Sequence, residues 1–384
     1  MKKIAFFNLN RITYQGGAEN YIIDIGNKFL ESGQEFVYIG DFRIFLRIFI
    51  IIGFVLGNIS FSECKKLLSE VGKYPVKDNR VNFPVEVINA GIFLPFSAFR
   101  KKIGSLTQKC DAMLVKNELI DMLLFRLLIP KSKKNYCVIF TSIRYPEANT
   151  FRAKVHNFFY LGIIYESLLK KYDGLIVSNK ADEELLISHF GIERKKIKYI
   201  PYGIDLNKFK SEKEDWKIPR IVEEKRKILF VGRLEEQKGV DDLVDIIKEK
   251  NKEENNYQFI IVGDGPSKEK IIDLSKEYGN IIYLGSQPHS KVLCIYEIAD
   301  LVIIPSHWET FCYVALEAQL SGKPVLCYDI PGPNEIVIDG VSGKIVSSQK
   351  EFSDHLDDEY EFDARHFAYN FSLEKVIEKY AEII

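Results

Sequence analysis

Short apolar runs alternate with helix-forming stretches along this whole chain, and this alternation restricts its fold more than any other feature. Runs such as GLIVSN (174–179) and KILFVG (227–232) have the length and β-branched content of buried strands. Longer amphipathic segments separate them, as in parallel α/β sheets. At 384 residues the chain exceeds the usual size of one core. We therefore predict two α/β domains, joined by the charge-rich stretch Pro201–Lys227.

Charge is divided unevenly between the two halves. Residues 1–200 carry 30 Lys and Arg against 19 Asp and Glu, whereas residues 201–384 carry 23 against 35. A basic half suits an anionic membrane surface or a phosphorylated substrate. Nucleic acid is not expected as a partner, because no nucleic-acid module is recognised in the sequence. The six cysteines form no CxxC pair or metal-ligand cluster, which is typical of reduced thiols in a cytosolic protein.

Two carboxylates, Glu309 and Glu317, flank a predicted strand-to-helix junction. The run DLVIIPS ends the strand, Thr310 is a candidate N-cap, and residues 311–320 have a helical pattern. Ligands of open α/β sheets bind at this edge, where a helix N-terminus can receive a phosphate. The alternative is that both acids are solvated. Against it, Glu317 lies among apolar residues, where a carboxylate needs hydroxyl or N–H partners.

Basic and glycine-rich turns follow other predicted strands. Arg233 ends one strand and Lys238 opens the next helix, an arrangement suited to a diphosphate, although Lys238 alone could be a solvated turn residue. Gly16 and Gly17 follow the first strand and permit close approach of a ligand, or form a simple turn. Gly263 marks a further turn at the same edge. The chain has no DxD triplet, so we expect no metal on the diphosphate.

Taken in order, these motifs resemble glycosyltransferase family 4, whose members are retaining enzymes with the GT-B fold. The matching stretches are GGAE (16–19), YIPYGID (199–205), VGRLEEQKG (231–239), VGDGP (262–266), YLG (283–285), the Glu309/Glu317 pair and GVSGKIV (340–346). The resemblance spans nearly the whole chain. It implies two Rossmann-like domains facing across a cleft: residues 1–203, with 368–384 crossing back as the final helix, on the acceptor side, and residues 204–367 on the donor side.

The resemblance also implies a role for each matching residue. Arg233 and Lys238 hold the diphosphate of a nucleotide sugar, Glu309 contacts the transferred sugar, and Glu317 binds the ribose. The backbone of Phe311, Cys312, Tyr313 and Val314 lies along sugar and phosphate, the base stacks near Gly285 and Ser286, and Gly17 closes over the phosphate. Transfer retains the anomeric configuration without a metal or other cofactor, and the leaving phosphate serves as the base for the acceptor hydroxyl.

One family feature is missing on the acceptor side. Many relatives carry a histidine at the end of a middle strand, whereas the matching stretches here, AMLVKNE and VIFTSIRYP, contain none. Asn117, Ser142 or Arg144 are the candidates for that place. His156 and His189 fall on predicted helices and are more simply explained as structural residues.

The segment Phe42–Gly57 is almost wholly apolar apart from two arginines, but it is too short to span a bilayer. It is either a buried core helix or an interfacial anchor. Nearby basic clusters favour the anchor, so we expect a peripheral protein on the inner face of the cell membrane that acts on a lipid-linked or glycan acceptor. Two alternatives remain: the same chemistry on a soluble acceptor, and a non-catalytic nucleotide-sugar-binding partner of another transferase.

Overall fold

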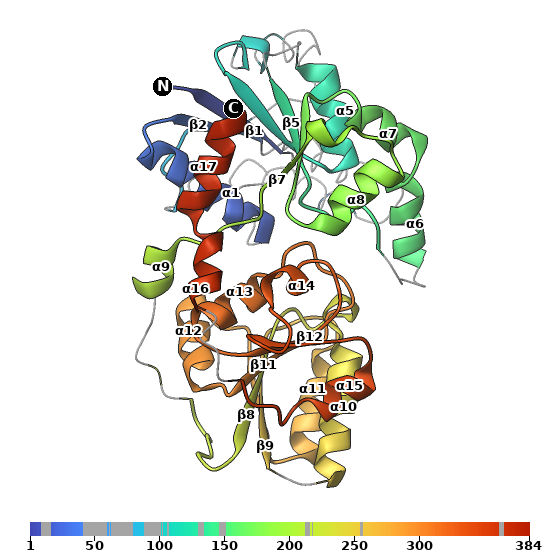
Figure 1. Ribbon diagram of the computed structural model, residues 1–384, viewed down its shortest axis with the longest axis vertical. Coiled ribbons are helices and arrows are strands. Elements are labelled where there is room, and N and C mark those ends of the chain that lie inside the picture. Colours follow the sequence, from blue (N-terminus) through green and yellow to red (C-terminus); the bar gives the residue numbers. More distant parts are fainter. Residues whose placement is uncertain are drawn as a thin grey trace.

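The computed structural model contains two parallel β-sheets, each covered by helices, which follow one another along the long axis of the molecule (Figure 1). It describes residues 1–8, 17–40, 60, 62, 80–87, 101, 103–105, 107–129, 134–145, 151–211, 216, 218–253, 256–360 and 365–384. Strands β1 to β7 form the first sheet and β8 to β13 the second. The predicted α/β class with two Rossmann-like domains is confirmed.

The N-terminal sheet has the order β3-β2-β1-β4-β5-β6-β7, and its strands pair in parallel. The strands are β1 (Lys3–Phe7), β2 (Glu35–Gly40), β3 (Val85–Val87), β4 (Ala112–Lys116), β5 (Asn135–Val138), β6 (Gly174–Val177) and β7 (Ile197–Tyr199). Strand β6 is buried along its whole length, which is why its sequence has no polar alternation.

Helices cover both faces of this sheet. One face carries α1 (Gly17–Glu31) and α17 (Leu373–Ile383), and the other carries α5 (Leu119–Leu128), α7 (Ile163–Leu169) and α8 (Lys180–Ser188). Alternate residues of β1 separate the two cores, since Ile4 and Phe6 join the first and Ala5 and Phe7 the second. Helix α6 (Phe151–Tyr160) lies at the edge of this domain, beside the second one (Figure 1).

The C-terminal sheet has the order β10-β9-β8-β11-β12-β13 and is also parallel. Its strands are β8 (Arg226–Val231), β9 (Tyr257–Val262), β10 (Ile281–Gly285), β11 (Leu301–Ile304), β12 (Val325–Tyr328) and β13 (Gly343–Val346). Helices α10 (Val240–Glu253), α11 (Lys268–Glu277) and α15 (Gln349–Asp354) cover one face, and α12 (His289–Ile298), α13 (Tyr313–Leu320) and α14 (Pro333–Ile336) the other. The carboxyl ends of β8 and β11, neighbours in the sheet, thus lie together.

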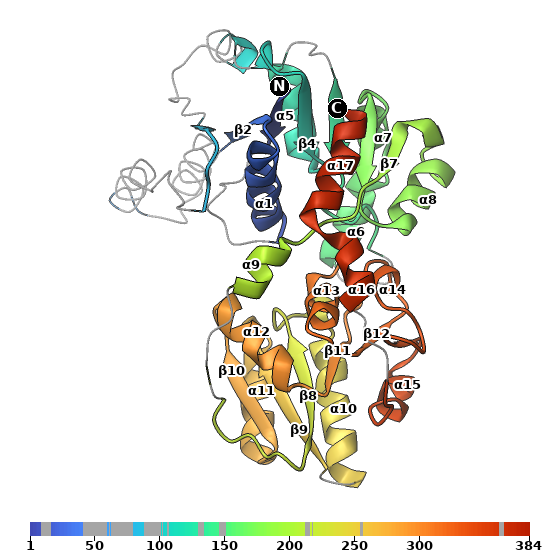
Figure 2. The same cartoon turned by 60° about the vertical axis from the view of Figure 1, so that its left-hand side comes forward.

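Two segments of the described chain link the domains, and they lie side by side. The outgoing segment runs from β7 into α9 (Leu206–Ser211), within the stretch predicted to be a linker, and the returning segment contains α16 (Arg365–Ala368). They pair at the junction, where Ile204 N donates to Phe371 O (2.9 Å) and Leu373 N to Ile204 O (3.1 Å). Helix α17 then packs along α1 in the N-terminal domain (Figure 2).

Thr310 is not an N-cap, because α13 begins only at Tyr313 and is preceded by Cys312 in a left-handed conformation (φ 75°). Helix α13 therefore begins two residues later than predicted. The segment Phe42–Gly57 lies outside the described residues. No helix among the residues that the structure does describe has the length and apolar character needed to cross a membrane.

Candidate active site

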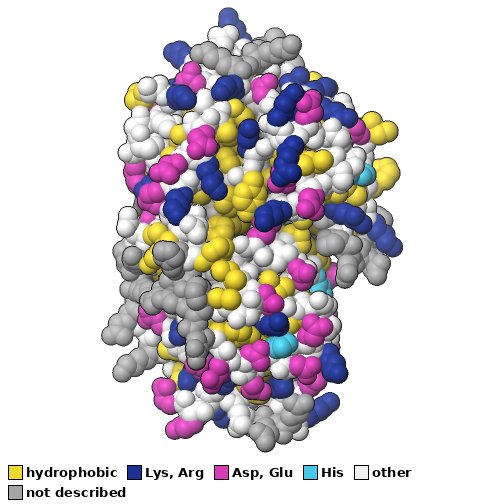
Figure 3. Space-filling model, viewed as in Figure 1, with side chains coloured by type: hydrophobic (Ala, Val, Ile, Leu, Met, Phe, Trp, Pro, Cys, Tyr) yellow, Lys and Arg dark blue, Asp and Glu magenta, His cyan; other side chains and the backbone are white. Residues whose placement is uncertain are grey.

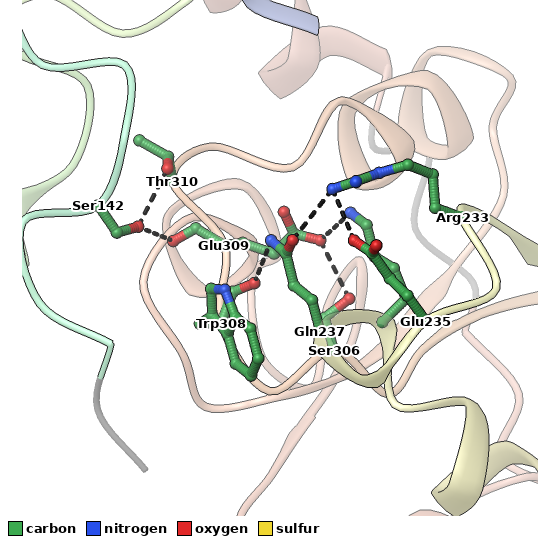
Figure 4. A network of polar contacts seen from close by, with 9 residues as sticks. Ser142, Arg233, Glu235, Gln237, Ser306, Trp308, Glu309 and Thr310 are labelled. Carbon is green, nitrogen blue, oxygen red and sulfur yellow. Dashed lines mark hydrogen bonds and ion pairs between the residues drawn. The ribbon is translucent and has the colours of Figure 1, made fainter. Parts of the chain in front are cut away.

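Glu309 occupies the loop after β11, at the carboxyl edge of the C-terminal sheet (Figure 4). Its side chain is only 8% exposed. The carboxylate pairs with the Lys238 ammonium, and Oε1 also accepts a hydrogen bond from Ser306 Oγ (3.0 Å). A carboxylate in such a dry place needs these partners to remain charged.

Lys238 reaches Glu309 from the 3-10 turn Glu236–Lys238, which follows β8. Burial is the largest single influence on Lys238 and lowers its pKa, but the charge of Glu309, the neighbouring Cys312 and the hydrogen bond to Glu309 together raise the net pKa above its usual value. Gly239 allows this close arrangement: it has φ +66°, and a Cβ there would stand 1.8 Å from Pro305 O. The β8 turn and the β11 loop are consequently packed backbone against backbone.

Arg233 is more open, with 67% of its side chain exposed. Its guanidinium pairs with Glu235 (2.7 Å) and donates to Gln237 Oε1 (3.1 Å). Gln237 Nε2 in turn donates to Trp308 O (3.0 Å), next to Glu309. The two cationic side chains of the VGRLEEQKG motif are thus joined to the Glu309 loop, Lys238 directly and Arg233 through Gln237. Figure 4 shows Arg233, Gln237 and Trp308 in this network. Gln237, Ser306 and Trp308 were not singled out from the sequence, because side chains that brace a loop have no distinctive spacing.

Glu317 lies in α13 and has the polar partners that its apolar surroundings require. Its Oε2 accepts a hydrogen bond from Tyr296 OH (3.0 Å), and its Oε1 lies 3.1 Å from His289 Nε2. Neither partner was identified from the sequence. Glu317, His289 and Tyr313 line a cavity of about 480 Å³ whose other wall is Tyr21 and neighbouring residues of α1. Glu317 and Glu309 open into different hollows, both between the domains.

The predicted glycine turns join the ends of three neighbouring strands. Gly263 has φ +142°, and a Cβ there would meet Gly232 O at 1.8 Å. Its N–H donates to Gly285 O (2.9 Å), and Gly285 has φ +65°. Ser286 follows as an exposed residue. Gly16 lies outside the described residues, and Gly17 is the first residue of α1.

Residues 311–314 connect the Glu309 loop to the first turn of α13. Phe311 is buried against Tyr202 and Phe371, and Cys312 is also buried. Burial raises the pKa of Cys312 to about 12, so its thiol stays protonated at neutral pH. Tyr313 and Val314 are half-buried and begin α13, whose N-terminal end carries partial positive charge.

The three acceptor-side candidates differ in what they do. Asn117 is fully buried and braces a loop: its Oδ1 accepts hydrogen bonds from Phe140 N (2.8 Å) and Thr141 N (3.0 Å). Ser142 faces the other domain, with Oγ 3.0 Å from Thr310 Oγ1. Arg144 is exposed and shares with Ser142 and Glu309 a cavity of about 330 Å³. Ser142 and Arg144 therefore adjoin Glu309, and Asn117 does not line this cavity.

Asp182 lines the same cavity and was not predicted. It is 6% exposed, and burial raises its pKa to about 6, although a hydrogen bond with Asn179 works in the opposite direction. Asn179 caps α8 by accepting from Asp182 N (2.7 Å). An Asn-x-x-Asp pattern at a helix start could have revealed the cap, but not the burial. His156 is stacked between Tyr145 and Tyr160, with ring centroids 4.0 and 4.1 Å away, which fits the structural role expected of it.

This arrangement suits a ligand that carries both an anionic group and several hydroxyl groups. Lys238 and Arg233 offer an ammonium and a guanidinium beside the positive end of α13. Glu309 and Glu317 offer carboxylates that can accept hydrogen bonds from hydroxyl groups. Among the residues that the structure describes, no three His, Cys, Asp or Glu side chains come together as a metal site.

Comparison with known proteins identifies the C-terminal domain. Residues 211–364 match the family model of glycosyl transferases group 1. A 41.2 kDa protein in the cps region of Klebsiella pneumoniae is 31% identical over 227 residues, covering 56% of this chain and 59% of the relative. D-inositol 3-phosphate glycosyltransferase of Segniliparus rotundus is 30% identical over 190 residues, covering 47% of this chain and 42% of the relative. The chain spans about half the length of the curated relatives it matches.

The whole chain also has a structural counterpart. Anabaena Alr3699/HepE in complex with UDP-glucose has a TM-score of 0.67 and 18% sequence identity, with 100% of this chain and 99% of that one covered. At this identity the likeness shows the fold alone. Together with the family match, it confirms the resemblance drawn from the motifs at the level of group 1 glycosyltransferases with the GT-B fold.

Proposed function

We propose that this chain, which carries a group 1 glycosyltransferase domain on the GT-B fold, is a retaining hexosyltransferase that uses a nucleotide-diphosphate sugar. The observation that carries the proposal is the pairing of Lys238 with Glu309 in a buried position between the ends of β8 and β11. Ser142, from the other domain, lies against the same loop. Residues 204–367 would form the donor domain, and residues 1–203 with 368–384 the acceptor domain.

The donor would bind mainly through its diphosphate. In the free protein the charge of Lys238 is matched by Glu309, and that of Arg233 by Glu235. An arriving diphosphate offers both cations a second anionic partner, and Glu309 can then accept a hydrogen bond from a sugar hydroxyl. Glu317 is held by Tyr296 and suits the ribose. The UDP-glucose complex of the structural neighbour supports a donor of this class.

Transfer would proceed as the bond between the anomeric carbon and the diphosphate breaks. Negative charge then accumulates on the diphosphate and positive charge on the sugar ring, so Arg233 and Lys238 stabilise the first and Glu309 the second. The departing phosphate oxygen takes the proton of the acceptor hydroxyl on the same face, which gives retention. Because the protein supplies the cationic charge, we expect no need for a metal.

The acceptor would be a lipid-linked or glycan hydroxyl, presented at the cytosolic face of the membrane. The basic N-terminal half and the apolar segment Phe42–Gly57 support a peripheral membrane location. Ser142 and Arg144 lie where an acceptor would approach Glu309.

Hydrolysis of nucleotide sugars in excess EDTA tests the proposal without knowledge of the acceptor. Slow hydrolysis of at least one donor is expected. Replacing Arg233 and Lys238 together by Ala should abolish it and should also lower the unfolding free energy, because Glu309 loses its buried partner, so the variant is assayed at a temperature where it remains folded. The matched control is Lys248→Ala, an exposed lysine of α10 outside the site. Binding should appear as a thermal shift with nucleotide diphosphates, since ligand at 100 times its Kd adds about 2.7 kcal/mol. Loss of activity in EDTA that returns with Mg²⁺ contradicts the metal-independent mechanism. Binding without hydrolysis of any donor indicates the non-catalytic alternative.

A further inference from the structure

Large apolar side chains are exposed where α6 turns into α7. Phe158 is 75% exposed and Ile163 is 83% exposed, with Phe159 and Ile164 exposed beside them. The rings of Phe158 and Phe159 contact each other edge to face, with centroids 5.4 Å apart. We call Val155, Phe158, Phe159, Ile163 and Ile164 the apolar corner. Four of these five residues lie between positions 158 and 164, around the bend at Gly162 that joins α6 to α7.

Helix α5 extends this surface. Ile120, Leu123 and Leu127 are exposed at spacings of three and four residues, so they form one stripe along α5. Helices α5 and α7 bury their inner sides against the same face of the N-terminal sheet, and α7 also contacts α6, so the stripe and the apolar corner lie on that side of the domain. Soluble monomers rarely expose a contiguous patch of large apolar side chains, and those that do usually bind a partner there.

The charges around this surface indicate an anionic partner. Arg126 on α5, Lys154 on α6, and Lys170 and Lys171 at the end of α7 are all exposed. Of the acids on these helices, Asp121 is buried and Glu166 is paired with Lys170. Figure 3 shows apolar side chains protruding at the right-hand edge of the upper domain, with Lys and Arg side chains nearby. Basic residues around protruding apolar groups are the composition of an interfacial membrane anchor.

Position in the fold links this surface to the cleft. Ala153, near the start of α6, lines a cavity of about 350 Å³ together with Arg233 and Trp308. Phe159 lies six residues further along the same helix, which corresponds to about 9 Å. A bilayer into which the apolar corner inserts would therefore lie beside the opening of the cavity that Ala153 and Arg233 line.

We infer that the apolar corner and the α5 stripe form a docking surface for an anionic lipid bilayer, distinct in sequence from Phe42–Gly57. The inference rests on the proposed function, since it explains how a lipid-linked acceptor would reach the cleft. The corner inserts among the headgroups, and the surrounding Lys and Arg contact the anionic lipids.

Co-sedimentation of the full chain with vesicles tests this inference, without any donor present. The wild type should bind phosphatidylglycerol–phosphatidylcholine vesicles more strongly than phosphatidylcholine vesicles, and less strongly at high salt. The triple variant Phe158→Ser, Ile163→Ser, Ile164→Ser should lower the partition coefficient at least about tenfold. Its control, Val222→Ser with Val341→Ser, alters exposed apolar residues of the C-terminal domain and should bind normally.

Two further variants separate the charges and the second apolar segment. The double variant Lys154→Glu, Lys171→Glu should weaken binding to anionic vesicles and leave binding to phosphatidylcholine vesicles unchanged. Because it keeps every apolar residue of the corner, it also tests the inference if the triple variant fails to fold. A variant with Ile48, Phe49, Ile50 and Ile51 replaced by Ser should keep a substantial part of the wild-type partition coefficient for anionic vesicles.

Three results would overturn the inference. They are a wild type that ignores vesicles, a triple variant that binds as the wild type does, and light scattering that shows a dimer which the triple variant dissociates. Donor hydrolysis is read separately, so failure of the proposed function is distinguishable from failure of the docking surface.

Discussion

At the scale of single residues, the two glutamates should have separable roles. Glu317→Ala should raise KM for the donor by about tenfold with little change in kcat, because a ribose contact is equally present in ground and transition states. Glu309→Gln should instead lower kcat, since charge on the sugar develops only during transfer. Steady-state kinetics on both variants measure this, and equal losses of kcat at unchanged KM would contradict the assignment.

Asp182 should make stability depend on pH. Its folded-state pKa of about 6 exceeds its ordinary value of 3.8, so the folded protein keeps a proton that the unfolded chain releases. Its contribution is therefore complete below pH 3.8 and is lost as pH rises through 6, by up to about 3 kcal/mol in unfolding free energy. Asp182→Asn removes the ionisation. In urea titrations, the unfolding free energy of the variant should therefore increase relative to that of the wild type as the pH rises from 4 to 7. Parallel profiles for the two proteins would show that Asp182 does not titrate in this range.

At the scale of elements, the packing of the β8 turn against the β11 loop should be sensitive to one methyl group. Gly239→Ala introduces a Cβ at Pro305 O and should shift the turn that carries Lys238, reducing both donor affinity and stability. Gly340→Ala is the matched control: its φ of +70° is similar, but a Cβ there meets nothing within 4 Å, so it should cost only about 1 kcal/mol of backbone strain. Thermal unfolding and donor titration compare the two, and equal effects would contradict a contact-based explanation.

The elements and their order could be predicted from the sequence, whereas the contacts between loops could not. Buried parallel strands such as β6 leave a continuous apolar pattern, and Gly263 or Gly285 mark the strand ends. The start of α13 was predicted wrongly, because Thr310 has the chemistry of an N-cap while Cys312 adopts a left-handed conformation that few residues of its type take. Asp182 was missed since its burial depends on tertiary packing, which no local pattern records.

At the scale of the whole molecule, the two domains share one continuous apolar core. The cluster that contains Phe29 and Tyr380 on the N-terminal sheet also contains Leu229 and Val302 of the C-terminal sheet. Tyr380→Ala should cost about 3–5 kcal/mol, as other deletions of buried aromatic rings do. Trp308 stacks on Tyr145 of the N-terminal domain, whereas Trp216 lies beside Lys291 of α12 in the C-terminal domain. In a Trp308→Phe background, the fluorescence of Trp216 in a urea titration therefore reports whether the loss reaches the second domain. Glu378→Ala, an exposed change on the same helix, is the control, and an unshifted tryptophan transition in Tyr380→Ala would mean that the domains unfold independently.

The two linking segments described above run side by side between the domains, which makes the protein modular. Ile204 and Ser372 form a parallel bridge, so the chain leaves the N-terminal domain and re-enters it at adjacent points. In this sense the C-terminal domain is an insertion within the N-terminal one. Both of its boundaries lie next to each other, so the domain can be replaced by changing the chain at two adjacent points. If the proposed function holds, exchanging residues 205–371 for the same part of a relative should change the preference for the nucleotide sugar and leave the acceptor preference unchanged. Such chimaeras offer a route by which recombination could diversify glycans one domain at a time.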